Sequence, residues 1–287
     1  MFHQLALGGA QQTERTVGND QLKPGGIPLK IEGVSKTFIG RAGTVEALRP
    51  VDVDVEAGQF ICLLGPSGCG KSTLLSIIAG LEIPTSGAVW AGGRKVRGPG
   101  TDRVLLFQEA ALFPWLDVQR NVEFGLRQAG MSAKERSATA QRYIELVHLK
   151  GFERSYVHQL SGGMRQRAAI ARALAIDPAI LLMDEPFGAL DALTRDRLHA
   201  ELESIWAATR KTVLFVTHNV REAVALGNRV LVFSPRPGRI LRDFHIDLPR
   251  PRSLEDHTLV DYTAEIMSVL QDAMAAQEQE DTNGKSD

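Results

Sequence analysis

One glycine-rich stretch decides the fold of this chain: Gly65-Pro66-Ser67-Gly68-Cys69-Gly70-Lys71-Ser72-Thr73. The apolar run 60–64 just before it predicts a buried strand, and Leu74, Ile77 and Ile78 just after it recur at helical spacing. Glycine lets main-chain N–H groups close around phosphate oxygens, and the first turn of a helix adds positive potential. Because strand, loop and helix occur together, a phosphate site is favoured over an ordinary glycine-rich turn.

Three side chains of this loop have different expected roles. Lys71 can reach the β- and γ-phosphates of a nucleotide, and Ser72 places a hydroxyl where Mg²⁺ needs an oxygen ligand. Cys69 is then a loop residue rather than a nucleophile. The sequence therefore predicts a bound nucleotide with Mg²⁺.

Length and composition set limits on the remaining possibilities. The 287 residues, of which 44% are hydrophobic, allow one large α/β domain or two small ones. The 33 basic and 34 acidic residues nearly cancel, so nothing points to nucleic acid or to an anionic membrane surface. Two cysteines offer no disulfide framework and fit a reducing compartment. No stretch approaches the roughly 18 apolar residues that span a bilayer, so we expect any membrane association through a partner.

Composition also divides the chain into segments. Polar ends without apolar periodicity predict disorder, and a change to helical patterns after Gln108 predicts an insertion. We expect a disordered tail at 1–27, one α/β domain at 28–250 with a helical insertion at about 109–172, a C-terminal helix at 251–275, and a second disordered tail at 276–287.

The first part of the domain has the pattern of an antiparallel sheet. Leu29 and Ile31, and later Val51, Val53 and Val55, alternate with polar residues, as in strands that bury one face. These strands precede the buried run 60–64 and differ from it in having a polar side. The sequence thus predicts a small antiparallel unit before a buried, mainly parallel sheet.

Two later apolar runs end in residues that suit phosphate chemistry. The run 180–183 delivers Asp184 and Glu185, and the run 213–216 is followed by His218. Ligands sit at the carboxyl ends of parallel strands. Asp184 suits a Mg²⁺ contact, and Glu185 is expected to point the other way along the strand. The alternatives are a solvated acidic loop for the two acids and a buried structural histidine for His218.

Five features taken together resemble one known family. The loop at 65–73, Gln108, the segment 160–167, the acids Asp184 and Glu185, and His218 occur in the order seen in ATP-binding-cassette (ABC) ATPases. The resemblance covers residues 29 to about 245. It implies an α/β fold: a P-loop NTPase core with a mainly parallel sheet, an N-terminal antiparallel β subdomain and an inserted α-helical subdomain.

The resemblance also implies cofactors and roles. ATP and Mg²⁺ are the expected cofactors, Glu185 is the base that activates water, and His218 contacts the γ-phosphate. Gln108 senses the metal and the water and transmits the state of the site to the insertion. The implied catalytic residues are Glu185, His218, Gln108 and Lys71, and the implied metal contacts are Ser72, Gln108 and Asp184.

The nucleotide-binding set implied by the family includes residues outside the glycine-rich loop. Phe38 matches the aromatic that stacks on adenine, although the family more often has Tyr there, and sequence alone favours core packing for it. Ser161 and Gly163 of one subunit close over the ATP held by the other, and Asp191 lies in the loop that crosses between subunits. The full set is Phe38, Gly65, Pro66, Ser67, Gly68, Cys69, Gly70, Lys71, Ser72, Thr73, Ser161, Gly163 and Asp191.

Two positions depart from the family pattern. Met164 stands where Gln is usual, and Asn219 follows His218 where Asp is common. Neither change removes a phosphate contact.

Three segments are similar to the nitrate, sulfonate and taurine importer group: 111–118, 161–167 and 187–191. This similarity implies a motor subunit that hydrolyses ATP at the cytoplasmic face of the inner membrane, where it is bound peripherally. The implied partners are a second copy in a homodimer that sandwiches two ATP, integral-membrane permease subunits and, indirectly, a periplasmic or extracellular solute-binding protein. No nucleic acid partner is expected. The solute is recognised by other subunits and cannot be named from this chain.

Other cassette proteins fit less well. A chromosome-maintenance ATPase would carry a long coiled coil between Lys71 and Ser161, a translation factor would have two phosphate loops, and a small-molecule kinase would lack 160–163. The remaining alternative is the ATPase of an exporter or a lipid-trafficking ABC system.

A cluster beside Gln108 suggests a docking surface. Leu112, Phe113 and Trp115 lie in the insertion, where no strand or helix pattern accounts for them. We expect a groove there for a helix of a membrane subunit. The alternative is that Trp115 belongs to the core.

Overall fold

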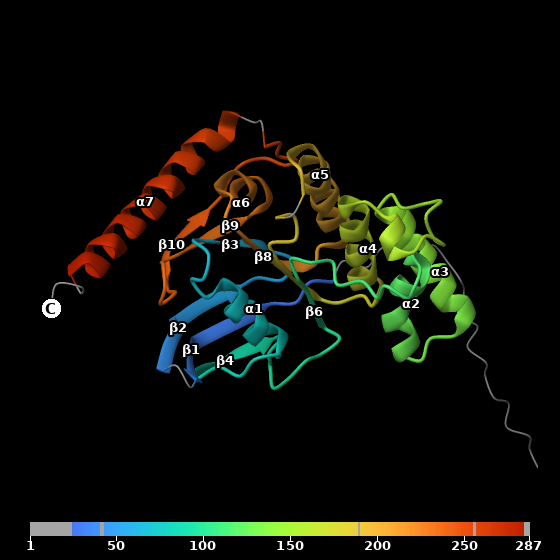
Figure 1. The fold of residues 1–287 in the computed structure, drawn as a ribbon, viewed down its shortest axis with the longest axis horizontal. Coiled ribbons are helices and arrows are strands. Elements are labelled where there is room, and N and C mark those ends of the chain that lie inside the picture. The colour runs from blue at the N-terminus through green and yellow to red at the C-terminus, as the bar shows by residue number, and fades with distance from the viewer. Residues whose placement is uncertain (1–24, 41–42, 189, 255–256, 284–287) are drawn as a thin grey trace, which may run out of the picture.

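The computed structural model describes residues 25–40, 43–188, 190–254 and 257–283 (Figure 1). The strands are β1 (Leu29–Gly40), β2 (Gly43–Val55), β3 (Phe60–Leu64), β4 (Ser86–Ala91), β5 (Arg94–Lys95), β6 (Arg103–Leu106), β7 (Ile180–Asp184), β8 (Thr212–Thr217), β9 (Arg229–Phe233) and β10 (Ile240–His245). The helices are α1 (Lys71–Ala79), α2 (Val118–Gln128), α3 (Ala133–Leu146), α4 (Gly162–Ala175), α5 (Ala192–Thr209), α6 (Val220–Leu226) and α7 (Val260–Asn283), with short 3₁₀ turns η1 (Val157–Gln159) and η2 (His257–Leu259).

Two sheets form the centre of the domain, as the sequence predicts. The first has the order β2-β1-β4-β5 and is antiparallel. The second has the order β10-β9-β3-β8-β7-β6 and is parallel except for β10, which pairs with β9 as a hairpin. Every residue of β3 is buried, which is typical of a parallel strand covered on both faces.

The side chains of β3 alternate between two hydrophobic cores. Ile61 and Leu63 pack with α1 and the antiparallel sheet. Phe60, Cys62 and Leu64 belong to the larger core that includes α4, α5 and α6. With both faces covered, only the ends of the parallel strands stay open, and the loops at their carboxyl ends carry the candidate site.

The insertion is helical, and it begins with strong capping signals. Asp117 caps α2 by accepting a hydrogen bond from the backbone N–H of Arg120, and Ser132 and Glu135 form a reciprocal capping box at α3. The last helix of this region, α4, continues to Ala175, three residues past the approximate predicted end of the insertion, and its buried face packs in the main core. Figure 1 shows α2, α3 and α4 on one side of the molecule and α7 on the other.

Two predicted tail boundaries are wrong. Residues 1–24 and 284–287 lie outside the described part of the chain, but residues 25–27 are bound to the domain. The N–H of Gly25 donates to the carbonyl of Thr209 at 3.2 Å, and the hydroxyl of Thr212 donates to the carbonyl of Ile27 at 2.7 Å. At the other end, α7 runs to Asn283 instead of stopping at 275, because its last turns are rich in Ala, Gln and Glu, which favour helix without an apolar face.

Among the described helices, none combines the length and the apolarity that a bilayer-spanning segment needs.

Candidate active site

The glycine-rich loop leads directly into α1. Gly70 precedes the helix at φ 97°, and a Cβ there would lie 2.6 Å from the carbonyl oxygen of Ala47, so only glycine fits. No side chain caps the first turn of α1, which leaves the N-terminal N–H groups to face an anion. Lys71 is buried, and its Nζ donates to the carbonyls of Gly65 and Pro66, both at 2.8 Å. The loop is therefore a rigid cradle with a fixed ammonium group.

A second loop, between β9 and β10, supports the cradle from outside. A Cβ on Gly238 would lie 1.8 Å from the carbonyl oxygen of Cys69, and the N–H of Gly238 donates to the carbonyl of Ala47 at 3.0 Å. This contact is not predictable from the sequence, because nothing in the Pro-Arg-Pro-Gly run at 235–238 reveals which distant loop it contacts.

Ser72 and Asp184 meet across the mouth of this cradle. Ser72 Oγ donates to Asp184 Oδ1 at 3.0 Å. Burial raises the pKa of Asp184, and the charge of Glu185 raises it further, while the Ser72 hydrogen bond and Lys71 oppose the shift. The Ser72 hydroxyl and the Asp184 carboxylate are both hard oxygen donors, and burial disfavours the charged form of Asp184. Such a pair fits Mg²⁺. The predicted metal contacts Ser72 and Asp184 are thus brought together.

Glu185 and His218 form a second pair, one residue beyond their strands. His218 Nδ1 lies 3.1 Å from Glu185 Oε2. The His218 side chain is 62% exposed, so the alternative of a buried structural histidine is wrong. Strand alternation predicts that Glu185 continues β7, but it does not. Its backbone takes φ 43°, and its N–H donates to the carbonyl of Val216. This left-handed turn, rather than the strand pleat, aims its carboxylate at His218.

Gln108 borders this cluster, and Phe38 lies on the strand that pairs with β2. A Cβ on Gly188 would be 3.3 Å from Gln108 Nε2 and 3.7 Å from Glu185 Oε2, so both side chains border Gly188. Phe38 is 39% exposed with Lys36 Nζ 4.8 Å from its ring centre, which removes the core-packing alternative. Its strand pairs with β2, whose residues near Ala47 contact the glycine-rich loop.

Ser161, Gly163 and Asp191 are placed together but apart from this cluster. Ser161 caps α4 by accepting from the N–H of Met164, and Asp191 caps α5 by accepting from the N–H of Thr194 at 3.0 Å. A Cβ on Gly163 would lie 2.7 Å from Thr194 Cγ2, so the two helix starts touch. Within the described residues, no hydrogen bond or ion pair joins this group to residues 65–73.

Comparison with known proteins agrees with this geometry. The family model described as ABC transporter matches residues 48–188. An ABC transporter ATP-binding protein of Methanocaldococcus jannaschii, itself uncharacterized, is 50% identical over 246 residues, which is 86% of this chain and 92% of the relative. The chain belongs to the ABC transporter ATP-binding proteins.

Other relatives of this ABC protein have named functions. The nitrate import ATP-binding protein NrtD of Synechocystis sp. is 51% identical over 77% of this chain and 83% of the relative. The taurine import ATP-binding protein TauB of Burkholderia pseudomallei is 51% identical over 77% of this chain and 85% of the relative. The dimeric structure of an ATP-binding cassette in a post-hydrolysis state with ADP and Pi has a TM-score of 0.69 and 33% identity, over 77% of this chain and all of that one. The predicted family, fold class and ATPase activity are confirmed.

Proposed function

We propose that this ABC ATPase is the motor subunit of an importer for a small solute of the nitrate, sulfonate or taurine type. In this proposal it works as a homodimer that sandwiches two ATP with Mg²⁺, bound peripherally to permease subunits at the cytoplasmic face of the inner membrane. A solute-binding protein delivers the solute. The observation that carries the proposal is that Ser72–Asp184 and Glu185–His218 converge beside the glycine-rich cradle.

Each side chain of the cluster has a distinct task in hydrolysis. Lys71 and the start of α1 neutralise the β- and γ-phosphates. Ser72, Asp184 and Gln108 would hold Mg²⁺, which when bound neutralises charge on the phosphate oxygens. A Glu185 carboxylate oxygen accepts a proton from the attacking water, and His218, 3.1 Å away, is within reach of the γ-phosphate.

The separation of Ser161 from the glycine-rich cradle within one chain supports the proposed homodimer. Ser161 is exposed at an α4 start that resembles a second anion site, yet among the described residues no hydrogen bond or ion pair joins it to the cradle. A head-to-tail copy would bring Ser161, Gly163 and Asp191 of one subunit to the ATP held by the other. A dimeric cassette among the structural neighbours supports this arrangement.

A groove in the insertion supports the permease partner. The groove has a volume of about 330 Å³ and is lined by Phe107, Phe113, Phe124 and the stem of Arg172, among others. The ring centroids of Phe113 and Phe124 lie 4.4 Å apart, and the Trp115 ring lies 5.5 Å from that of Phe113, tilted by 39°, while remaining 69% exposed. Exposure of 69% removes the alternative that Trp115 is core. A helix of a membrane subunit is the occupant that we propose, because the groove adjoins Gln108 of the active site.

The relatives that import nitrate and taurine favour import over the exporter alternative. The test is reconstitution of the chain with its co-purifying permease in vesicles that enclose ATP and Mg²⁺. Added solute-binding protein with nitrate or taurine should then drive accumulation of that solute. ATP hydrolysis that ignores every binding protein, together with ATP-driven transport in the opposite direction, would support the exporter instead.

A further inference from the structure

A buried series of hydrogen bonds leads from α5 to the turn that carries His218. His199 Nε2 bonds to Glu222 Oε1, and the hydroxyl of Thr217 donates to Glu222 Oε2. His199 is 5%, Glu222 5% and Thr217 3% exposed. Both oxygens of this buried carboxylate are therefore occupied, one by a side chain of α5 and one by the last residue of β8.

These bonds fix the backbone on both sides of His218. Thr217 precedes it and is held by Glu222 through the hydroxyl. Asn219 follows it, and the N–H of Asn219 donates to Thr217 Oγ1 at 3.0 Å, while Asn219 Oδ1 accepts from the N–H of Glu222 at 3.3 Å. Among the described residues, the imidazole itself makes no hydrogen bond to this network and lies against Glu185. The network thus positions His218 without touching its ring.

The Glu185 side of the site contacts the same network. The ring of Phe187, two residues after Glu185, meets the His199 ring edge-on at 5.1 Å between centroids. His199 therefore packs against the loop that carries the proposed base while it bonds to the residue that holds the His218 turn.

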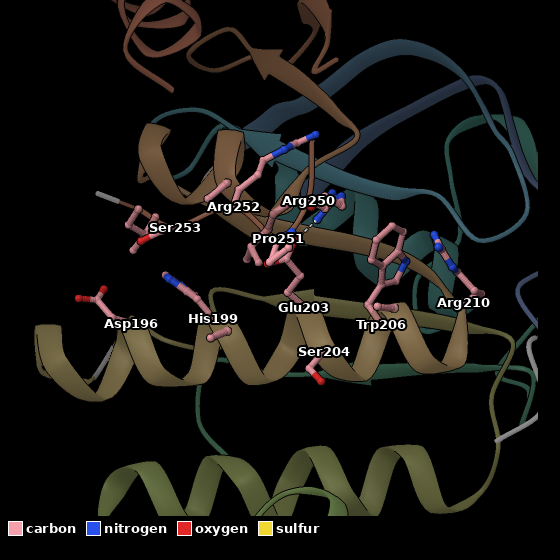
Figure 2. Close-up of a pocket in the computed structure, with 15 residues that line it drawn as sticks. Asp196, His199, Glu203, Ser204, Trp206, Arg210, Arg250, Pro251, Arg252 and Ser253 are labelled. Atoms are coloured by element: carbon pink, nitrogen blue, oxygen red, sulfur yellow. Dashed lines mark hydrogen bonds and ion pairs between the residues drawn. The ribbon is translucent and has the colours of Figure 1, made fainter. Parts of the chain in front are cut away.

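Helix α5 supplies an internal comparison. Figure 2 shows His199 and Glu203 on successive turns of α5, both facing a cavity of about 730 Å³ between α5 and residues 250–254. Glu203 is as buried as Glu222, but its carboxylate pairs with Arg250 at 2.8 Å and, within the described chain, makes no bond to β8. A buried carboxylate in this region therefore need not bond to a strand that leads into the active site. Glu203 makes no such bond, whereas Glu222 bonds to Thr217 at the end of β8.

We propose that Glu222 is a positioning residue of the ATPase, which uses Thr217 and His199 to hold His218 at its working distance from Glu185. The proposal rests on the role proposed above for His218. A shift of His218 of about 1 Å would move it out of reach of the transferring phosphoryl group and slow hydrolysis by roughly a hundredfold, without changing the phosphate cradle.

The most direct test removes one hydroxyl. In the full-length protein, Thr217→Val deletes the donor to Glu222 and the acceptor for Asn219 but keeps the side-chain shape, whereas Thr217→Ser keeps both bonds. We expect Thr217→Val to lower kcat for ATP by about tenfold or more, with KM and nucleotide affinity within about twofold of wild type. Thr217→Ser should restore kcat to near wild type.

A second pair of variants keeps the test valid if Thr217→Val folds poorly. Glu222→Gln can bond to both His199 and Thr217 and should keep kcat within about threefold, while Glu222→Ala should lose as much as Thr217→Val. The matched control is Glu203→Gln, which should leave kcat unchanged. Thermal unfolding of each variant separates misplacement of His218 from loss of folded protein.

Several results would overturn the proposal. These are wild-type kcat in folded Thr217→Val, an equal loss in Thr217→Ser, or a fall of kcat, affinity and thermal midpoint together in every variant. The His218→Ala variant separates the proposed role of His218 in hydrolysis from the positioning role of Glu222. If it hydrolyses ATP normally, the proposed role of His218 fails; if it is inactive while Thr217→Val is normal, only the positioning role fails.

Discussion

The two halves of the ATP site differ in how far one chain completes them. On the cradle side, Ser72 bonds to Asp184 and Glu185 lies against His218, so side chains from distant segments already interact. On the other side, the side chains of Ser161 and Asp191 remain exposed and, in the part of the chain that the structure describes, hydrogen-bond only within the first turns of their own helices. The difference indicates that the first half is organised before ATP binds, whereas the second half needs another surface.

Loss of the cradle ammonium should have the largest effect. Lys71→Ala should abolish measurable ATP turnover, because Lys71 neutralises charge on the β- and γ-phosphates in both the ground and the transition state. A phosphate-release assay on folded protein measures this. Lys211→Ala is the control, since Lys211 is equally buried but pairs with Asp177 elsewhere. Near wild-type turnover in folded Lys71→Ala would show that residues 65–73 are not the active site.

The next largest effect should come from a change on the side of the ATP site that carries Ser161 and Asp191. Ser161→Arg should abolish ATP-dependent association and reduce turnover by about tenfold or more, while a single subunit still binds ATP through its cradle. Ser132→Arg is the matched control, because Ser132 is also an exposed N-cap, and either change costs a cap worth about 1 kcal/mol. Equal loss of association in both variants would attribute the effect to helix fraying.

Damage to the groove should affect assembly rather than chemistry. Trp115→Ala should weaken co-purification with the membrane subunits by about tenfold and leave basal ATPase activity in place, since Trp115 is exposed and is not among the proposed phosphate or metal contacts. Phe152→Ala provides the control, as another exposed aromatic of the insertion. Intact assembly in Trp115→Ala, or lost basal hydrolysis, would count against the docking surface.

The smallest predicted effect is on stability. The pKa of Asp184 is raised in the folded chain, so its carboxylate opposes folding at pH values above that pKa. Asp184→Asn should therefore raise the thermal midpoint slightly at pH 7 without ATP, and the gain should fade as the pH falls through the raised pKa and be absent below the pKa of an unfolded Asp.

The carboxylate of Asp191 should have the opposite effect on folding stability, so Asp191 serves as the control. Hydrogen bonds from Thr194 lower the pKa of Asp191, so its carboxylate contributes stability above the unfolded pKa, and this is lost as pH falls through the lowered value. Asp191→Asn should lower the midpoint at pH 7. Differential scanning fluorimetry from about pH 2 to about pH 8, a range that extends well to either side of the unfolded Asp pKa of about 3.9, would reveal a common sign if these assignments are wrong.

Sequence reasoning succeeded where local pattern determines structure. The apolar run 60–64 and the helical spacing after Lys71 fix the strand, loop and helix of the cradle, and two further apolar runs fix where Asp184 and His218 emerge. It failed where distant segments meet. The approach of Gly238 to Cys69 depends on packing between loops that no periodicity records.

The direction of single side chains was harder still to predict. Glu185 was expected to follow strand alternation, but its left-handed backbone is imposed by the bond of its N–H to Val216 on the neighbouring strand. Likewise, Thr217 and Glu222 give no local sign that they share a hydrogen bond with His199 of another helix. Such contacts become visible only when the fold brings the elements together.

The central claim is that two copies of this chain complete each other's ATP sites, and the Glu185→Gln variant tests it most directly. The substitution removes the base but keeps its shape and leaves the phosphate cradle intact, so ATP should bind without being hydrolysed. In size-exclusion chromatography with light scattering, the account predicts the 31.3 kDa chain as a monomer without nucleotide and a species of twice that mass with ATP and Mg²⁺. ATP-saturated Glu185→Gln that keeps the mass of one chain at every concentration would contradict it.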